Sequence, residues 1–281
     1  MMAGYIVVGV DGSAPATAAV EWAAADAQRR GLAIRIVHVG EQQWPHGETI
    51  ECRAGALEAA ADRARRLTRD VKVTAELLSG HVITNLIAES ESADSLVLGS
   101  RGLGGFARMV LGSVGTAVAG HAAGPVVVVR APAVVQHGRI VVGDDGSEHS
   151  EAAMAYAVEQ AGARGAQLHV VSACQMPALS PYAVNYSSLM ESALRDEARV
   201  ARERVIPWRE RSPGLVITDD QPFEHPAIAL VEASRTADLV VVGSRGLGGF
   251  ASAVLGSVSR GVLHRVHCPV AVVRPRAKAR P

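Results

Sequence analysis

The sequence predicts an α/β fold made of two tandem domains, each an open sheet of five parallel strands with helices on both faces. Residues 6–13 read IVVGVDGS, and residues 140–147 repeat them as IVVGDDGS. A longer segment at residues 99–114, GSRGLGGFARMVLGSV, recurs at residues 243–258 with 14 of 16 positions identical. In each half, runs rich in Val and Ile alternate with helical segments of about a dozen residues, which favours right-handed crossovers and a parallel sheet.

The expected strands are apolar runs that lack polar alternation, as strands covered on both faces do. The first helix is expected to begin at Ser13 as N-cap, with Pro15 in its first turn, and to end at Gly31. The remaining helices of the first half are expected at residues 52–70, 81–93 and 113–122. The strands are expected at residues 5–10, 33–39, 71–78, 95–98 and 126–129 of the first half and at residues 139–143, 167–173, 215–218, 238–242 and 269–273 of the second.

The spacing of the repeated segments locates an insertion and a domain boundary. The copies are offset by 134 residues for the first segment and by 144 for the second, so the second half carries ten extra residues. We expect these as loop variation around residues 175–194. Residues 131–138, APAVVQHG, contain a proline and a glycine without periodicity and are typical of a linker. The predicted domains are therefore residues 1–130 and 139–281.

Composition excludes several classes of protein. Lys plus Arg equals Asp plus Glu at 28 each, so the chain lacks the excess positive charge of a nucleic-acid-binding protein. The apolar run at residues 5–10 is interrupted by Asp11, well short of a signal-peptide core or a membrane span, so we expect a cytoplasmic protein with no membrane partner. The three cysteines are far apart and lack CxxC spacing, which predicts reduced thiols and no zinc site.

The repeated segments also predict a ligand site. In an open parallel sheet, ligands bind beyond the carboxyl ends of the strands, where the strand order reverses. Asp11 ends the first strand, and the glycine loop at residues 99–113 follows the fourth. Glycines let the backbone approach an anion, and Ser113 opens the next helix, so a phosphate would fit there. A tight strand-to-helix connection without a ligand is the alternative, which the near identity of the two loops disfavours.

Both loops have the spacing G-x2-G-x9-G-S, beginning at Gly99 and Gly243, with neither the Walker lysine nor a clean GxGxxG after the first strand. This pattern resembles the ATP-binding branch of the universal stress protein family, and the resemblance covers nearly the whole chain. The family implies strand order 3-2-1-4-5, ATP in a cleft above the first and fourth strands, and Mg²⁺ with the triphosphate. It also implies pairing of the two halves through their fifth strands and a homodimer of the whole chain.

Position by position, the resemblance places Asp11 and Asp145 at the nucleoside and Val39 in the adenine pocket. It makes the loop glycines and serines ligands of ribose and phosphates, with Arg101 and Arg245 as charge partners. We expect no catalytic residue and no metal ligand from the protein. The candidate nucleotide-binding residues are Gly9, Asp11, Val39, Gly99, Ser100, Arg101, Gly102, Gly105, Gly112, Ser113 and Val114, and in the second half Gly143, Asp145, Ala173, Gly243, Ser244, Arg245, Gly246, Gly249, Gly256, Ser257 and Val258.

The second half departs from the first beside the expected site. Val10 is replaced by Asp144, which adds a carboxylate next to Asp145, and Val39 is replaced by Ala173. A second negative charge near a polyphosphate is unfavourable unless a metal or an arginine offsets it. We therefore expect two sites of unequal affinity.

Binding rather than catalysis is the function that these residues predict. Hydrolysis needs a positioned water and strong charge stabilisation, and the loops contain glycines, serines and one arginine each, with no obvious base. We expect an adenine-nucleotide-binding stress-response or regulatory protein with slow ATP hydrolysis at most. A slow ATP hydrolase and an interaction module that acts without nucleotide are the alternatives.

Overall fold

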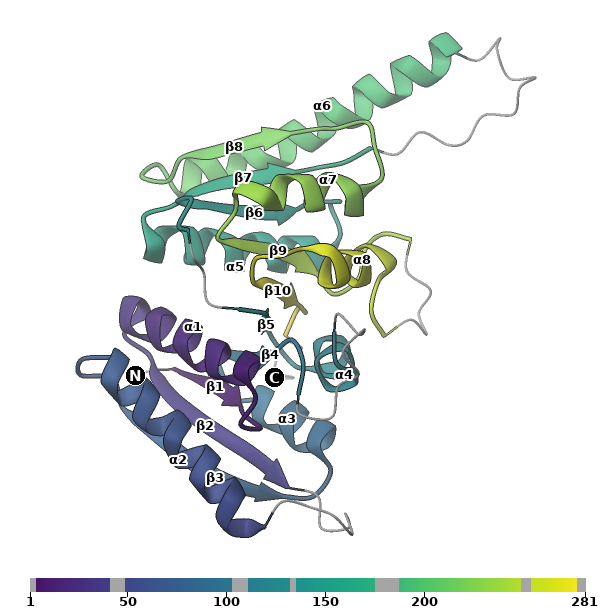
Figure 1. The fold of residues 1–281 in the computed structure, drawn as a ribbon. Helices are drawn as coiled ribbons and strands as arrows, with labels where there is room; N and C mark the ends of the chain where they lie inside the picture. The colour runs from purple at the N-terminus through teal and green to yellow at the C-terminus, as the bar shows by residue number, and fades with distance from the viewer. Residues whose placement is uncertain are drawn as a thin grey trace, which may run out of the picture.

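The computed structural model describes residues 4–40, 49–102, 111–131, 135–174, 187–248 and 254–276, and these form one ten-stranded sheet with helices on both faces (Figure 1). None of the described helices is both long enough and apolar enough to cross a membrane. The first half contributes β1 (Tyr5–Gly9), α1 (Ala14–Arg30), β2 (Ala33–Gly40), α2 (Ile50–Leu67), β3 (Val73–Ser79), α3 (Val82–Ser90), β4 (Ser95–Gly99), α4 (Ser113–His121) and β5 (Val126–Val129). The second half contributes β6 (Arg139–Gly143), α5 (Glu148–Arg164), β7 (Gln167–Val171), α6 (Ser187–Arg211), β8 (Ile217–Asp220), α7 (Pro226–Ala233), the short 3₁₀ helix η2 (Ser234–Thr236), β9 (Leu239–Gly243), α8 (Ser257–Arg265) and β10 (Val270–Val273).

The sheet order is β3-β2-β1-β4-β5-β10-β9-β6-β7-β8, so the predicted order 3-2-1-4-5 is confirmed in each half. Neighbouring strands within a half are parallel, with Ile6 of β1 opposite Ser95 of β4, for example. The halves meet where β5 and β10 pair antiparallel, with Val128 opposite Val270. Neither β5 nor β10 therefore presents an open edge in this structure.

The helices after β1 and β6 begin and end with the same signals. Ser13 and Ser147 are their N-caps, and each side-chain oxygen accepts a hydrogen bond from the amide three residues later. Both helices end at a glycine in the left-handed region, Gly31 at φ 65° and Gly165 at φ 60°. A β-carbon is unfavourable in that conformation, so glycine is the residue that stops a helix there.

Small residues allow the helices to lie close to the sheet. Ala19 and Ala23 of α1 are fully buried against the strands. Gly99, at the end of β4, lies so close to the start of α1 that a β-carbon on it would be 2.7 Å from the carbonyl carbon of Pro15. Gly243 stands in the same relation to His149 of α5, at 2.8 Å. The first helix of each half is therefore held against the strand end where the ligand was expected.

Two elements of the second half differ from the prediction. The strand expected at residues 215–218 is β8 at Ile217–Asp220, because the Leu215 amide donates to the Ser212 carbonyl (3.0 Å) in the turn that precedes the strand. Helix α6 has 25 residues against 18 in α2. The extra residues, expected as loop, therefore lengthen this helix in part, and residues 175–186 lie outside the described ranges.

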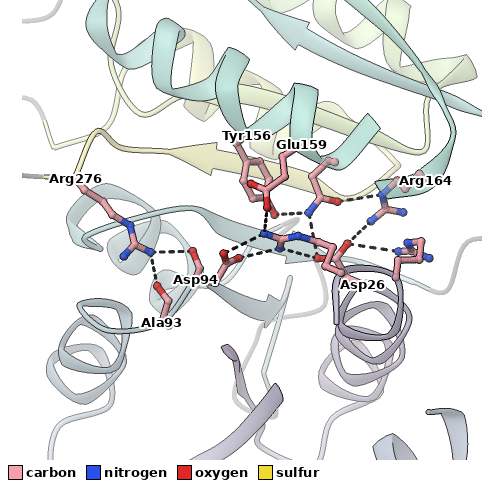
Figure 2. Close-up of polar contacts among 10 residues, drawn as sticks. Asp26, Ala93, Asp94, Tyr156, Glu159, Arg164 and Arg276 are labelled. Atoms are coloured by element: carbon pink, nitrogen blue, oxygen red, sulfur yellow. Dashed lines mark hydrogen bonds and ion pairs between the residues drawn. The ribbon is translucent and has the colours of Figure 1, made fainter. Parts of the chain in front are cut away.

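A polar cluster joins α1 to α5 across the junction of the halves (Figure 2). Asp26 is fully buried, and its carboxylate accepts hydrogen bonds from Arg30 (3.2 Å), Gln160 (3.1 Å) and Arg164 (3.2 Å). Arg30 also forms two hydrogen bonds with Asp94 (2.8 and 3.0 Å). The contact between the halves thus contains charged groups that depend on one another for compensation.

Candidate functional site

The end of the first strand and the glycine loop after the fourth meet in both halves. A β-carbon on Gly102 would lie 2.5 Å from Asp11 Oδ2, and one on Gly246 would lie 2.3 Å from Asp145 Oδ2. At these distances an added β-carbon would displace the carboxylate, so glycine lets the loop lie directly against the aspartate in both halves. In the second half the Leu247 amide donates to Asp145 Oδ2 (3.1 Å), so a hydrogen bond ties the loop to the strand end.

Asp11 and Asp145 also order the turn that follows each strand. Each Oδ1 accepts a hydrogen bond from the backbone amide two residues later, at 3.0 Å in both halves. Burial acts to raise the pKa of the Asp145 carboxyl, but hydrogen bonds from Ser147, Leu247 and Ser150 outweigh it and lower that pKa below its ordinary value. Asp145 is therefore an ionised acceptor at neutral pH, suited to hydroxyl or amino donors.

The helices after the glycine loops begin at a residue that has no side chain. Gly112 and Gly256 are the N-caps of α4 and α8, and their amides donate to the carbonyls of Ser100 and Ser244 (2.8 Å each), which closes the loops. No side chain among the described residues caps either helix. The first-turn amides of such a helix can instead donate to an anion, which the helix dipole also favours.

In the second half these groups surround a cavity of about 590 Å³. That volume lies within the range of about 300–1,000 Å³ for small-molecule sites. Apolar side chains such as Val171, Leu230 and Leu255 complete its wall, together with Arg260. Its lining includes nine of the second-half candidates, namely Gly143, Asp145, Ala173, Gly243, Arg245, Gly246, Gly256, Ser257 and Val258.

The serines before the loop arginines lie elsewhere. Ser244 is fully buried and does not line the cavity, and its Oγ is 2.9 Å from Nδ1 of His149. Burial, with the positive charges of Arg245 and Arg274, lowers the pKa of His149. Ser100 is also buried. In this structure the Ser244 hydroxyl thus serves a contact within the protein, where the sequence suggested a donor to the ligand.

In the first half the candidates occupy equivalent places. Gly9 ends β1, Val39 lies in β2, and Val39 and Val114 are partly buried against one apolar cluster. Arg101 and Gly102 are exposed at the loop, and Ser113 is the first residue of α4. The remaining two candidates, Gly105 and Gly249, lie outside the described residues.

Sequence reasoning missed the partner of Asp144. The Asp144 carboxylate is 7% exposed and accepts hydrogen bonds from Arg204 Nε of α6 (2.9 Å) and from Ser150 Oγ (3.0 Å). The arginine needed to offset this carboxylate is thus supplied from within the chain. A signal was available, because at offsets of 134 and 144 residues Val10 and Ala60 of the first half are replaced together by Asp144 and Arg204.

Comparisons with known proteins agree with this architecture. The model of the universal stress protein family matches residues 2–130 and again residues 137–274. Universal stress proteins of Mycolicibacterium smegmatis and Mycobacterium tuberculosis are 35% and 36% identical to the chain, each over 96% of its length and over 97% and 96% of their own. A solved universal stress protein from Archaeoglobus fulgidus shares the fold, with a TM-score of 0.72 and 22% identity over 99% of this chain and 100% of its own.

Proposed function

Since the chain belongs to the universal stress protein family, we propose that it is an adenine-nucleotide-binding regulatory protein with one cleft in each half, and that ATP is its ligand. One observation carries the proposal. In both halves an aspartate at the end of the first strand touches a glycine of the loop after the fourth, next to a helix that begins at an uncapped glycine. A nucleoside acceptor and a phosphate-binding helix terminus therefore lie side by side.

Each part of the second cleft has a role in this proposal. The phosphates would accept hydrogen bonds from the amides at the start of α8, with Ser257 as a further donor and Arg245 and Arg260 as cations in the lining. The base would lie against the apolar wall that includes Ala173 and Leu230. Asp145 would accept from the nucleoside.

Mg²⁺ would enter with the triphosphate as its counter-ion. Among the described residues no group of three or more His, Cys, Asp or Glu side chains is placed to hold a metal ion. The ion would therefore take its ligands chiefly from phosphate oxygens and water, as Mg²⁺ does in many nucleotide sites. Its contribution would be to neutralise phosphate charge.

We propose binding rather than fast turnover. The cavity lining contains one further carboxylate besides Asp145, that of Asp144, and this carboxylate is hydrogen-bonded to Arg204. Neither is a free base near the phosphate end, so hydrolysis would be slow at most. An interaction module that acts without nucleotide is the second candidate, and it is favoured by Leu247, which is 75% exposed in the cavity lining.

Assembly and location are part of the proposal. The pairing of β5 with β10 would persist in solution as the contact between the halves, and two chains would form a homodimer. We place the protein in the cytoplasm, without membrane partners, and the balanced charge argues against nucleic-acid partners.

The test counts nucleotides released from the denatured protein by mass spectrometry, after incubation with ATP and removal of unbound nucleotide. We expect about two per chain, about one in Gly102→Glu or Gly246→Glu, and none in the double variant, because the added carboxylate repels phosphate and collides with Asp11 or Asp145. Gly214→Glu is the matched control, since a side chain there would meet nothing within 4 Å. Unchanged stoichiometry in the double variant would refute the site assignment, and no bound nucleotide in the unaltered protein would favour the interaction module.

A further inference from the structure

We propose that the two clefts are energetically coupled, so that nucleotide in one strengthens binding in the other, and that Arg130 and Arg274 carry the coupling. The proposal rests on the proposed function, because it concerns the same two sites. Each arginine follows the fifth strand of its own half and donates to the fourth helix of the opposite half. That helix begins at the glycine loop of the opposite half's cleft.

The first crossing runs from the second half to the first. Arg274 directly follows β10, and its Nη1 donates to the Gly120 carbonyl (2.9 Å) in the last turn of α4. The last carbonyls of a helix lack partners within the helix and carry partial negative charge, so a guanidinium there is favourable. The other end of α4 begins at Gly112 and Ser113 of the first cleft. One short helix thus connects the first cleft to Arg274.

The second crossing mirrors the first. Arg130 directly follows β5, and its Nη2 donates to the Leu263 carbonyl in the last turn of α8. The N-terminal end of α8 begins at Gly256 and Ser257, which line the second cavity. The chain therefore repeats the arrangement with the roles of the halves exchanged.

The end of α4 is also in direct contact with the opposite half. A β-carbon on Gly120 would lie 2.3 Å from Cγ1 of Val254, so the last turn of α4 packs against the residues just before α8. Val254 directly precedes Leu255, which lines the second cavity. A change in the position of α4 would therefore shift the residues just before α8 in the second half, because closely packed interfaces do not deform continuously.

Electrostatics supplies the link between ligand and arginine. Burial, followed by the positive charge of Arg245, lowers the pKa of Arg274, and burial, followed by the charge of Arg101, lowers the pKa of Arg130. Each crossing arginine therefore feels a like charge from the loop arginine of its own half's cleft. A phosphate beside Arg245 would offset this repulsion and favour Arg274 at the end of α4.

The sign of the coupling follows. Nucleotide in the second cleft favours the contact of Arg274 with the end of α4, and this contact fixes α4, whose first turn would bind phosphate in the first cleft. Nucleotide in the first cleft acts on α8 through Arg130 in the same way. Such coupling is reciprocal by thermodynamic linkage. We expect occupancy of one cleft to raise the affinity of the other about fivefold, within the usual range for coupled sites.

The experiment is calorimetric titration of the full chain with Mg·ATP. Gly102→Glu and Gly246→Glu, each with one open cleft, give the two intrinsic affinities, and the two-site curve of the unaltered chain then gives the coupling factor. The same three titrations are repeated in the Arg130→Gln/Arg274→Gln background, where we expect the factor to fall to one. Arg276→Gln is the matched control, because Arg276 also crosses between the halves, to the carbonyls of Ala93 and Asp94 (Figure 2), and its loss should leave the factor near five.

The outcomes separate this inference from the proposed function. If none of the three proteins, the unaltered chain and the two single-cleft variants, binds Mg·ATP, the proposed function fails. If the nucleotide binds but the factor is one or less in the unaltered chain, the coupling is refuted while the sites stand. A factor that persists in the double arginine variant, or that is lost equally in Arg276→Gln, removes the role of Arg130 and Arg274. Circular dichroism of each variant excludes loss of the fold as the cause.

Discussion

Beside its cleft, the second half carries a charge pair where the first half has two apolar side chains. In the first half Val10 and Ala60 line a cavity of about 370 Å³ between α1 and α2. In the second half the equivalent positions hold Asp144 and Arg204. The guanidinium of Arg204 packs against Gly146, since a β-carbon on Gly146 would lie 3.3 Å from it. Either member of the pair alone would leave a charge in a partly buried place without the opposite charge that now offsets it. The comparison teaches that in the second half the additional carboxylate beside the cleft occurs together with a cation that offsets it.

A second asymmetry lies at the junction of the halves. Asp26 of α1 and Gln160 of α5 are equivalent at an offset of 134 residues, and both are fully buried. The carboxylate of Asp26 accepts hydrogen bonds from both Arg30 and Arg164, whereas the neutral amide of Gln160 donates to Asp26 and accepts from Arg164. The charge of the cluster is therefore centred on one half, and substitutions at the two positions should differ in cost.

The largest effect is expected from Asp26→Ala. Its loss leaves two largely buried arginines without their shared carboxylate, so the free energy of unfolding should fall by about 3–5 kcal/mol. The measurement is urea unfolding followed by circular dichroism. Gln160→Ala is the matched control and should cost about 1–3 kcal/mol, since it removes the hydrogen bonds of a neutral amide and leaves the ion pairs of Asp26 in place. An equal or larger cost for Gln160→Ala would contradict the assignment of Asp26 as the centre of the cluster.

A smaller effect is expected when the charge pair of the second cleft is broken. Arg204→Ala should lower the free energy of unfolding by about 2 kcal/mol, because Asp144 is 7% exposed while Arg204 is 34% exposed and partly screened by water. Asp144→Val/Arg204→Ala installs the residues of the first half and should recover most of that loss. Chemical unfolding of the two single variants and the double variant gives the coupling between the residues. Additive costs, without recovery in the double variant, would show that the pair is not a unit.

The fold could be predicted from the sequence because the repeat and the apolar runs are strong signals. The strand order of each half followed from family resemblance, and the helix bounded by Ser13 and Gly31 followed from capping chemistry. The start of β8 was misplaced because Leu215 is apolar like a strand residue, yet its amide serves a turn. The length of α6 could not be predicted, because extra residues between two repeats fit a longer loop as well as a longer helix. The local pattern of apolar residues does not reveal which backbone amides donate to a turn instead of a neighbouring strand.

The candidate site was predicted in outline and not in its contacts. The meeting of Asp145 with Gly246 follows from topology, since strand ends at a reversal of order are neighbours. The contact of the Ser244 hydroxyl with His149 could not be predicted from the repeat, because the first half has Pro15 at the position of His149 and offers no such partner. The pairing of Asp144 with Arg204 was readable only by comparing both positions between the halves at once.

The smallest expected effect is a difference in the pH dependence of stability between the unaltered chain and His149→Pro, which installs the residue of the first half, Pro15. Burial and the charges of Arg245 and Arg274 lower the folded-state pKa of His149 below its ordinary value of 6.5, against the opposing charges of Glu148 and Asp145. Below pH 6.5 the unfolded chain therefore binds a proton that the folded chain resists, so the stability present above that pH is lost as the pH falls toward the folded-state pKa. Thermal unfolding from pH 8 to pH 5 should show a shallower loss of stability in the variant, because its position 149 has no group to titrate. Parallel curves for the two proteins would mean that His149 is protonated as easily in the folded state as in the unfolded one, and that its neighbours do not exclude the charge.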